Sequence, residues 1–238
     1  MNAVILLSGG TGSRLKSDLP KQYIHVGGRM LITYALEPLL SSQYVDAVYI
    51  VAAHEWRMLI LEDAERAGLA ISRIKGFAEP GRNRQYSILN GLRSIPGCED
   101  GRACAKDTVL IHDAARPLLS SRLLESCYKS FTGHDGVMPA LPMKDTVYLS
   151  DGGKRVEKLL DRSRIYAGQS PELFDLKKYY HANLALMPDR ILEINGSTEP
   201  ALMAGMDIVM IPGEEKNFKV TTKEDLYRFQ ELVEKGNI

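Results

Sequence analysis

The chain has 238 residues, of which 45% are hydrophobic, and its 30 basic and 30 acidic residues give a formal net charge of zero. This size and composition suit one globular α/β domain, and the balanced charge argues against nucleic acid or a membrane surface as a partner. No apolar run approaches the ~20 residues that a membrane span needs, and residues 1–7 lack the basic leader of a signal peptide. The three cysteines include no CxxC pair, which favours thiols in a reducing cytoplasm over disulfides or a metal cage.

Strand-like and helix-like stretches alternate along most of the chain. The run 4–7 is continuously aliphatic, as in a central parallel strand, and apolar residues between 32 and 40 follow helical spacing. Further strands are expected at 45–52, 71–74, 108–112 and 136–140, and further helices at 55–67, 85–95 and 121–131. This alternation predicts a mostly parallel sheet with helices on both faces. In such sheets, ligands bind at the carboxyl ends of the strands.

The alternation breaks near Pro142. Residues 144–149 and 156–160 read as two strands around Asp151-Gly152-Gly153, which predicts a β-hairpin inserted at 142–166. An isolated hairpin is marginally stable in water and needs a partner surface. We therefore expect this arm to join two chains in a homodimer.

The α/β pattern resumes after the hairpin. Helices are expected near 176–187 and 200–204, with a strand at 208–211 between them and the last helix. That helix should begin near Thr222, where Thr221 and Glu224 have the spacing of a capping box. The whole pattern predicts a single domain over residues 1–238, with the arm as an insertion.

A glycine-rich loop, Ser8-Gly9-Gly10-Thr11-Gly12-Ser13-Arg14, directly follows the first strand. Glycines permit close backbone approach, and successive N–H groups can form a nest for an anion. A dinucleotide fingerprint would need a glycine at position 15, which is Leu15, and a Walker loop would need Gly-Lys-Ser/Thr. Arg14 and Lys21 add two cations, which suits a triphosphate. The alternative is an ordinary glycine-rich turn with solvated cations.

Five further motifs follow the first loop and its neighbour Pro20-Lys21-Gln22. They are the segment 81–91 (Gly-Arg-Asn-Arg-Gln-Tyr-Ser-Ile-Leu-Asn-Gly), His112-Asp113-Ala114-Ala115-Arg116-Pro117, Lys144-Asp145-Thr146 with Asp161-Arg162-Ser163, Gln169-Ser170-Pro171, and the segment 217–222 (Asn-Phe-Lys-Val-Thr-Thr). In type and order these motifs resemble the sugar-nucleotide pyrophosphorylase superfamily. More narrowly, the chain is similar along its whole length to the cytidylyltransferases of methylerythritol phosphate or ribitol phosphate. The resemblance implies a Rossmann-like fold.

Two segments depart from the family pattern. The family commonly shows Gln-Thr-Pro-Gln where this chain has Gln169-Ser170-Pro171-Glu172. It often has Thr-Asp-Asp-Ala before the final strand, where this chain has Ser197-Thr198-Glu199-Pro200-Ala201. Loss of that acidic pair bears on the identity of the acceptor.

The resemblance implies attack of an acceptor phosphate oxygen on the α-phosphorus of CTP, with pyrophosphate as the leaving group and Mg²⁺ as the cofactor. The nucleophile is already ionised, so positioning and electrostatics are the main sources of catalysis. The implied catalytic residues are Arg14, Lys21 and Lys219. The implied nucleotide-binding residues are Ser8, Gly9, Gly10, Thr11, Gly12, Gly81, Asn83 and Ser87. The implied acceptor-binding residues are Asp113, Arg116, Thr146 and Arg162, with Asp113 also a candidate metal ligand.

Several of these residues have a structural alternative. Lys219 could be a solubilising lysine on an edge strand, Asn83 could belong to the N-cap of the helix near 85, and Asp113 could pair with Arg116. His112 adjoins Asp113, but neighbouring strand residues point to opposite faces, so a structural role is expected for it.

The first choice of acceptor is 2-C-methyl-D-erythritol 4-phosphate, which implies isoprenoid precursor synthesis. Ribitol 5-phosphate, for CDP-ribitol and cell-surface polymers, is the alternative. Two other classes compete with both: another nucleotidyltransferase or dinucleotide enzyme on a similar fold, and a catalytically silent nucleotide-binding module. A silent module would be expected to lose Lys21 or Lys219, and the sequence retains both.

Overall fold

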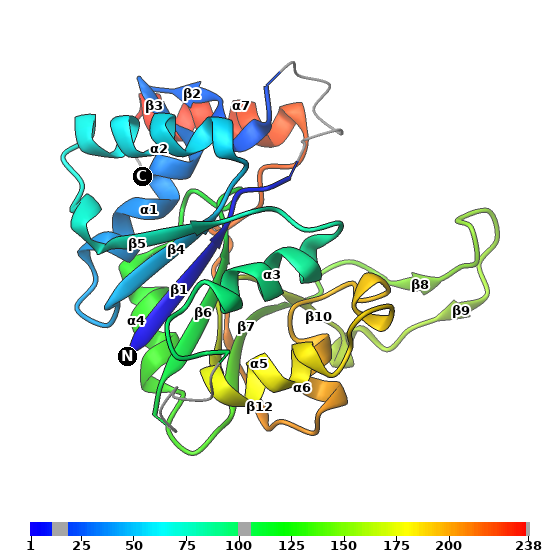
Figure 1. The fold of residues 1–238 in the computed structure, drawn as a ribbon. Coiled ribbons are helices and arrows are strands. Elements are labelled where there is room, and N and C mark those ends of the chain that lie inside the picture. Colours follow the sequence, from blue (N-terminus) through cyan, green and yellow to red (C-terminus); the bar gives the residue numbers. More distant parts are fainter. Residues whose placement is uncertain (11–18, 100–105, 237–238) are drawn as a thin grey trace.

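The computed structural model describes residues 1–10, 19–99 and 106–236. Within these ranges a central sheet of eight strands has the order β10-β7-β11-β6-β1-β4-β5, with β12 beside β7 (Figure 1). The strands are β1 (Asn2–Leu7), β4 (Ala47–Val51), β5 (Ile74–Ala78), β6 (Thr108–Asp113), β7 (Gly136–Pro142), β10 (Tyr166–Gly168), β11 (Glu172–Asp175) and β12 (Ile208–Pro212). Strands β10 and β11 run against their neighbours, and the others are mutually parallel. The predicted mostly parallel sheet is confirmed.

Helices cover both faces of this sheet, as the alternation predicted. They are α1 (Leu31–Ser41), α2 (His54–Arg66), α3 (Arg84–Arg93), α4 (Ser121–Lys129), α5 (Leu176–Leu184), α6 (Glu199–Met203) and α7 (Lys223–Glu234). Val4 and Leu6 of β1 pack in one buried cluster with residues of α1, α2 and α4, whereas Ala3 and Ile5 pack in another with residues of α3, α5 and α6. Successive strand residues point to opposite faces, so residues 3–7 of β1 are all aliphatic because both faces of the strand are covered.

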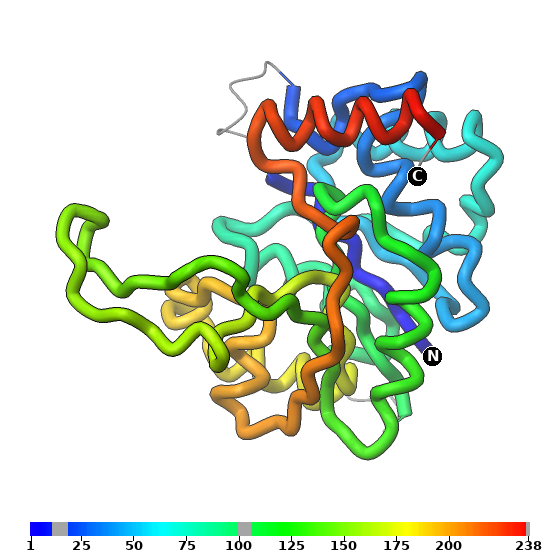
Figure 2. Tube along the Cα trace, turned by 180° about the vertical axis from the view of Figure 1, so that it is seen from behind, coloured from blue at the N-terminus to red at the C-terminus, as the bar shows by residue number. Residues whose placement is uncertain are grey.

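The C-terminal helix returns to the beginning of the chain. Phe229 of α7 is fully buried with Val26 and Tyr34, and its ring meets the Tyr34 ring edge to face with 5.1 Å between centroids. Val26 lies in the short pair β2 (His25–Val26) and β3 (Arg29–Met30), which adjoins the 3₁₀ turn η1 (Lys21–Tyr23). Figure 2 shows α7 running beside these N-terminal segments. This packing brings the segment before α7, residues 219–221, close to η1.

Two expected element starts lie at other residues in the structure. Residues 71–73 form a 3₁₀ turn, η2 (Ile71–Arg73), and the strand expected at 71–74 begins only at Ile74 as β5. The capping box of α7 uses Thr222 and Asp225, one residue later than the expected Thr221 and Glu224. Both pairs have the same spacing, so the sequence pattern alone did not distinguish them. No helix in the described part of the chain is long and apolar enough to cross a membrane.

The predicted hairpin is confirmed, although its strands are shorter than the expected 144–149 and 156–160, and it stands away from the sheet. Its strands β8 (Tyr148–Leu149) and β9 (Lys158–Leu159) pair antiparallel, with Tyr148 opposite Leu159. In Figures 1 and 2 the arm projects from the body beyond β7 and β10. Its apolar side chains are exposed, 54% for Tyr148, 59% for Leu159 and 68% for Val156. With Leu149, these residues gather on one short hairpin, and a group of exposed apolar side chains marks an interaction surface where single ones do not.

Candidate nucleotide-binding site

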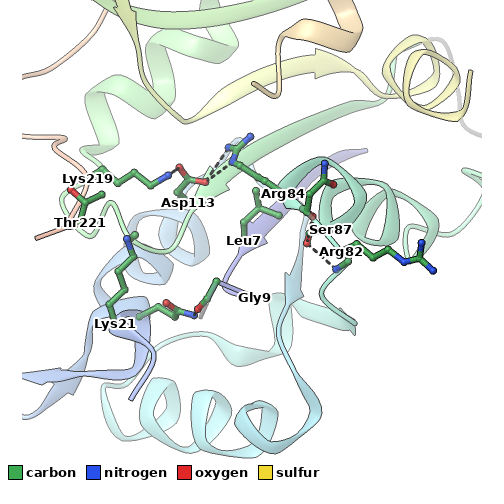
Figure 3. Close-up of a pocket in the computed structure, with 14 residues that line it drawn as sticks. Leu7, Gly9, Lys21, Arg82, Arg84, Ser87, Asp113, Lys219 and Thr221 are labelled. Atoms are coloured by element: carbon green, nitrogen blue, oxygen red, sulfur yellow. Dashed lines mark hydrogen bonds and ion pairs between the residues drawn. The ribbon is translucent and has the colours of Figure 1, made fainter. Parts of the chain in front are cut away.

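A cavity of about 420 Å³ opens at the carboxyl ends of β1 and β6, where the sheet order predicted a ligand site (Figure 3). Five segments that are distant in sequence meet there: the end of β1 with the glycine loop, η1, the turn before α3, the end of β6, and the segment before α7. The lining residues are Leu7, Gly9, Gly10, Lys21, Gln22, Gly81, Arg82, Asn83, Arg84, Ser87, Asp113, Ala115, Lys219 and Thr221.

Gly9 lets the glycine loop approach Pro80 closely, and Gly81 lets the chain turn tightly into α3. A Cβ atom on Gly9 would lie 2.6 Å from the Cβ of Pro80, and one on Gly81 would lie 2.7 Å from the backbone nitrogen of Ser87. Such distances are too short for any side chain, so the glycine requirement here is steric. The Gly81 N–H also donates to the Ser87 hydroxyl at 2.9 Å. The glycine loop and the turn before α3 thus form one continuous wall of the cavity.

Asn83 caps α3 and borders the cavity as well. Its side-chain oxygen accepts the backbone N–H of Tyr86 at 2.8 Å, and its side-chain nitrogen donates to the Ile191 carbonyl at 2.8 Å. The structural alternative for Asn83 is therefore confirmed. A nucleotide-binding role stays a prediction, because the N-terminus of α3 faces the cavity and can still serve an anion.

A row of alternating charges crosses the cavity. Asp113 accepts Lys219 Nζ on one carboxylate oxygen at 2.8 Å and Arg84 Nη2 on the other at 3.0 Å (Figure 3). Burial alone would raise the pKa of Asp113, but Arg84 and Lys219 outweigh it and hold that pKa well below its usual range. Asp113 is thus a fixed negative charge that keeps two cations in place. The expected alternative pair with Arg116 does not form.

The row continues to Glu172, a residue of one of the two departing segments. Its carboxylate lies 3.9 Å from Arg84 Nη2 and accepts the Thr198 hydroxyl at 2.6 Å and the Ser197 hydroxyl. Burial raises the pKa of Glu172, which Arg84 and the two hydroxyls partly offset. The two segments that depart from the family pattern therefore contact each other directly.

Lys21 reaches the cavity from η1. Its Nζ donates to the Val220 carbonyl at 2.7 Å, next to Lys219 in the chain. Gln22 Nε2 donates to the Gly10 carbonyl at 2.7 Å and so fixes the glycine loop. The structure thus brings the two predicted lysines, Lys21 and Lys219, to the same cavity as the glycines.

Other predicted residues lie outside this cavity or outside the described ranges. Thr11, Gly12 and Arg14 belong to residues 11–18, which the structure does not describe. Ser8 is buried, and its hydroxyl donates to the Tyr23 hydroxyl at 2.9 Å. Arg116 donates to the Asn217 carbonyl at 2.6 Å and does not line the cavity.

Thr146 and Arg162 lie at the base of the arm and are both exposed. Arg162 donates from Nη1 to the Lys144 carbonyl at 2.9 Å, within the arm itself. Neither residue lines the cavity of its own chain. Of the residues predicted for the nucleotide, Gly9, Gly10, Gly81, Asn83 and Ser87 line the cavity of one chain together with Asp113, but the rest of the predicted acceptor set does not.

His112 is structural, as predicted. It is fully buried, and burial lowers its pKa to about 4, so the ring is neutral at physiological pH. Its Nδ1 lies 3.2 Å from the Ser170 hydroxyl and its Nε2 lies 3.1 Å from the Arg116 carbonyl oxygen. The ring ties the end of β6 to the segment between β10 and β11.

Sequence reasoning gave no ligand-binding role to several residues at the site. Gln22, Arg82, Arg84 and Thr221 line the cavity, and each lies inside a motif that carried the family resemblance. Membership of those motifs was the available signal. Glu172 was noted only as a departure, and nothing local in the sequence connects it to Arg84.

Comparison with known proteins supports the resemblance seen in the motifs. A family model described as 2-C-methyl-D-erythritol 4-phosphate cytidylyltransferase (IspD) matches residues 2–235. A protein of that name from Thermotoga neapolitana is 35% identical over 95% of this chain and 94% of its own length, and one from Clostridium acetobutylicum is 28% identical over 100% of both. The 4-diphosphocytidyl-2C-methyl-D-erythritol synthase of Anaerococcus prevotii has the same fold, with a TM-score of 0.79, 22% identity and coverage of 98% of this chain and 96% of that chain. This chain belongs to the 2-C-methyl-D-erythritol 4-phosphate cytidylyltransferase family.

Proposed function

We propose that this chain transfers the cytidylyl group of CTP to 2-C-methyl-D-erythritol 4-phosphate, with release of pyrophosphate, in isoprenoid precursor synthesis. The observation that carries the proposal is the cavity at the ends of β1 and β6. Lys21 and Lys219 meet there beside the glycine wall and the ionised Asp113. A match to the family over residues 2–235 supports the same reaction.

The arrangement suits a reaction between two anions. The acceptor phosphate is an ionised nucleophile, so the site needs no general base and must instead bring the phosphates together and stabilise developing charge. Lys219 and Lys21 supply fixed positive charge for the α-phosphate and the leaving pyrophosphate, and Arg14 is proposed as a third cation. Gly81, Asn83 and Ser87 are proposed to bind the nucleoside, with the glycine loop of Ser8 to Gly12 binding the phosphates.

We propose Mg²⁺ as the divalent metal. Mg²⁺ is held in many phosphate sites by few protein carboxylates, with substrate phosphates and water completing the shell. Asp113 fits this pattern as a single carboxylate at the cavity, and no cluster of three or more potential ligands occurs among the described residues. When bound, the ion would neutralise charge on the phosphate oxygens.

The acceptor site is proposed to form between two chains of a homodimer. Residues 1–238 would act as one nucleotidyltransferase domain whose 142–166 arm reaches the neighbouring chain. Exposed apolar side chains on the arm support this, as do Thr146 and Arg162, which do not reach their own cavity. Asp113 and Arg116 would complete the acceptor site from the other chain. A cytoplasmic location stays a prediction from the cysteine pattern.

A pyrophosphate-release assay with purified protein and Mg²⁺ tests the proposed function. We expect turnover with CTP above ATP, GTP and UTP, and with 2-C-methyl-D-erythritol 4-phosphate above ribitol 5-phosphate. A tenfold preference in kcat/KM corresponds to about 1.4 kcal/mol of transition-state discrimination. A tenfold preference for ribitol 5-phosphate would replace the acceptor, and no turnover with any pair would favour a silent nucleotide-binding module.

A further inference from the structure

We propose that Glu172 is a positioning residue for the transfer reaction. The Ser197 and Thr198 hydroxyls hold its carboxylate, and that carboxylate holds the Arg84 guanidinium so that Asp113 is shared between Arg84 and Lys219. The kinetic part of this inference rests on the proposed function. Its structural part concerns only how these side chains order one another.

The sheet places Glu172 on the same face as Asp113. Glu172 of β11 pairs with Ile111 of β6, two residues before Asp113 on that strand, and residues two apart point to one face. Arg84 begins α3 above this face. Glu172 does not itself line the cavity. Any effect that it has on catalysis must therefore pass through Arg84.

A buried carboxylate at this position is a poor choice for stability alone. The Glu172 side chain is 10% exposed, and an ionised group taken out of water costs free energy unless it is well paired. Two hydroxyls and one guanidinium now share that carboxylate, and Ser197 and Thr198 are themselves buried. Three segments thus converge on a single negative charge beside the nucleotide cavity. This is what a site arranged to fix Arg84 requires.

The consequence of losing that charge follows from Coulomb attraction. Arg84 Nη2 lies between two carboxylates, 3.0 Å from Asp113 Oδ1 and 3.9 Å from Glu172 Oε2. Without Glu172, the guanidinium would be drawn wholly to Asp113 and could take both of its oxygens as a bidentate pair. Lys219 would then lose its partner at 2.8 Å and its fixed position. The expected effect is on turnover more than on CTP binding.

The first test is Glu172→Gln, which keeps the shape and removes the charge. Outer partners that orient a reactive group contribute 10- to 100-fold at metal sites, and we expect kcat and kcat/KM to fall together by about tenfold. The KM for CTP should stay within twofold, because no cavity contact is lost. The Tm should stay within about 3 °C of wild type, because an ion with a burial cost is removed. Glu199→Gln is the matched control, since Glu199 accepts the Asn195 N–H; its kcat should not change.

The second test moves the carboxylate from residue 172 to residue 198. Thr198→Asp places a carboxylate one bond beyond the present hydroxyl, which lies 2.6 Å from the Glu172 carboxylate, so the new group faces residue 172. Alone it sets two carboxylates together, and we expect a lower Tm. Combined with Glu172→Gln it restores one acid and one donor, and kcat should recover to within threefold of wild type. Recovery by a second substitution is not expected of a residue that merely fills space.

Each outcome decides the inference. An unchanged kcat in Glu172→Gln, an equal loss in Glu199→Gln, or no recovery in the double variant would overturn it. If Glu172→Gln does not fold, Thr198→Val removes one of the two hydroxyls that hold Glu172 and keeps the carboxylate. An unchanged kcat in Thr198→Val would also overturn the inference. If wild type turns over no acceptor, the proposed function fails, and crystal structures then decide: Arg84 must shift in Glu172→Gln and return in the double variant.

Discussion

The cavity and the arm differ in how their polar and charged side chains are held. At the cavity, Asp113 is buried and contacts Lys219 and Arg84 at 2.8 and 3.0 Å. On the arm, Thr146 and Arg162 are exposed, and the contact found for Arg162 is with a carbonyl of its own arm. The charged groups of the cavity are preorganised within one chain, whereas the polar groups of the arm do not line the cavity of that chain.

This difference indicates separate roles for the cavity and the arm in the reaction. Electrostatic catalysis depends on charges fixed before the substrate arrives, and burial of a charge network achieves this. Acceptor recognition needs groups that approach a second molecule, and an arm can supply them to a neighbouring chain. The comparison therefore predicts large rate effects at the cavity and effects on acceptor binding at the arm.

The largest expected effect is at Lys219. Lys219→Ala should lower kcat by about 100-fold or more, because it removes a preorganised cation, and Lys21→Ala should act in the same direction. The fold should persist, since Arg84 still pairs with Asp113. Lys223→Ala, on the exposed start of α7, is the matched control. Turnover near wild type in both cavity variants would remove the basis of the proposed mechanism.

The second effect tests whether the arm acts between chains. Arg162→Ala should raise the KM for the acceptor at least tenfold and leave the KM for CTP unchanged, because the variant lacks the guanidinium that we propose binds the acceptor phosphate. Deleting 144–158 should give a monomer with the same defect. Sedimentation of the intact protein as a monomer at micromolar concentration would contradict the proposed dimer.

Mixing Lys219→Ala and Arg162→Ala subunits sharpens the test. In a two-fold dimer each site would combine the cavity of one chain with the arm of the other. A mixed dimer then contains one intact site, and random reassortment of equal amounts should restore roughly a quarter of wild-type activity. If the arm serves its own chain, no activity will return.

The sequence predicted those parts of the molecule whose signal is local. Aliphatic runs located β1, β4 and β6, and the glycine loop with Lys21 marked the cavity. Glycine at position 81 could be associated with the site because its motif is contiguous, although its steric reason needed the packing against Ser87. Local patterns therefore predicted most of the architecture and the part of the site formed by the glycine loop, Lys21 and Gly81.

The remainder depends on contacts between distant segments. Strand β11 lies antiparallel between β6 and β7, and nothing in its four residues distinguishes that place from a parallel one. Arg84, Glu172 and Thr198 meet only because α3, β11 and the start of α6 converge. Such a cluster has no periodicity or spacing to reveal it. The sequence could show that positions 172 and 197–201 were unusual, but not that Ser197 and Thr198 contact Glu172.

The smallest expected effect is a change in labelling rate rather than in activity. Val156→Cys places a thiol at a position that is 68% exposed in one chain. If the arm packs on a neighbouring chain, this thiol should react at least tenfold more slowly with iodoacetamide at high protein concentration than at dilution into monomers, with peptide mapping by mass spectrometry as the readout. Cys127 supplies the internal reference, because burial raises its pKa to about 12 and keeps it a thiol at pH 8. Equal rates for position 156 at all concentrations would mean that this end of the arm stays in water, and the interface would then have to lie nearer Arg162.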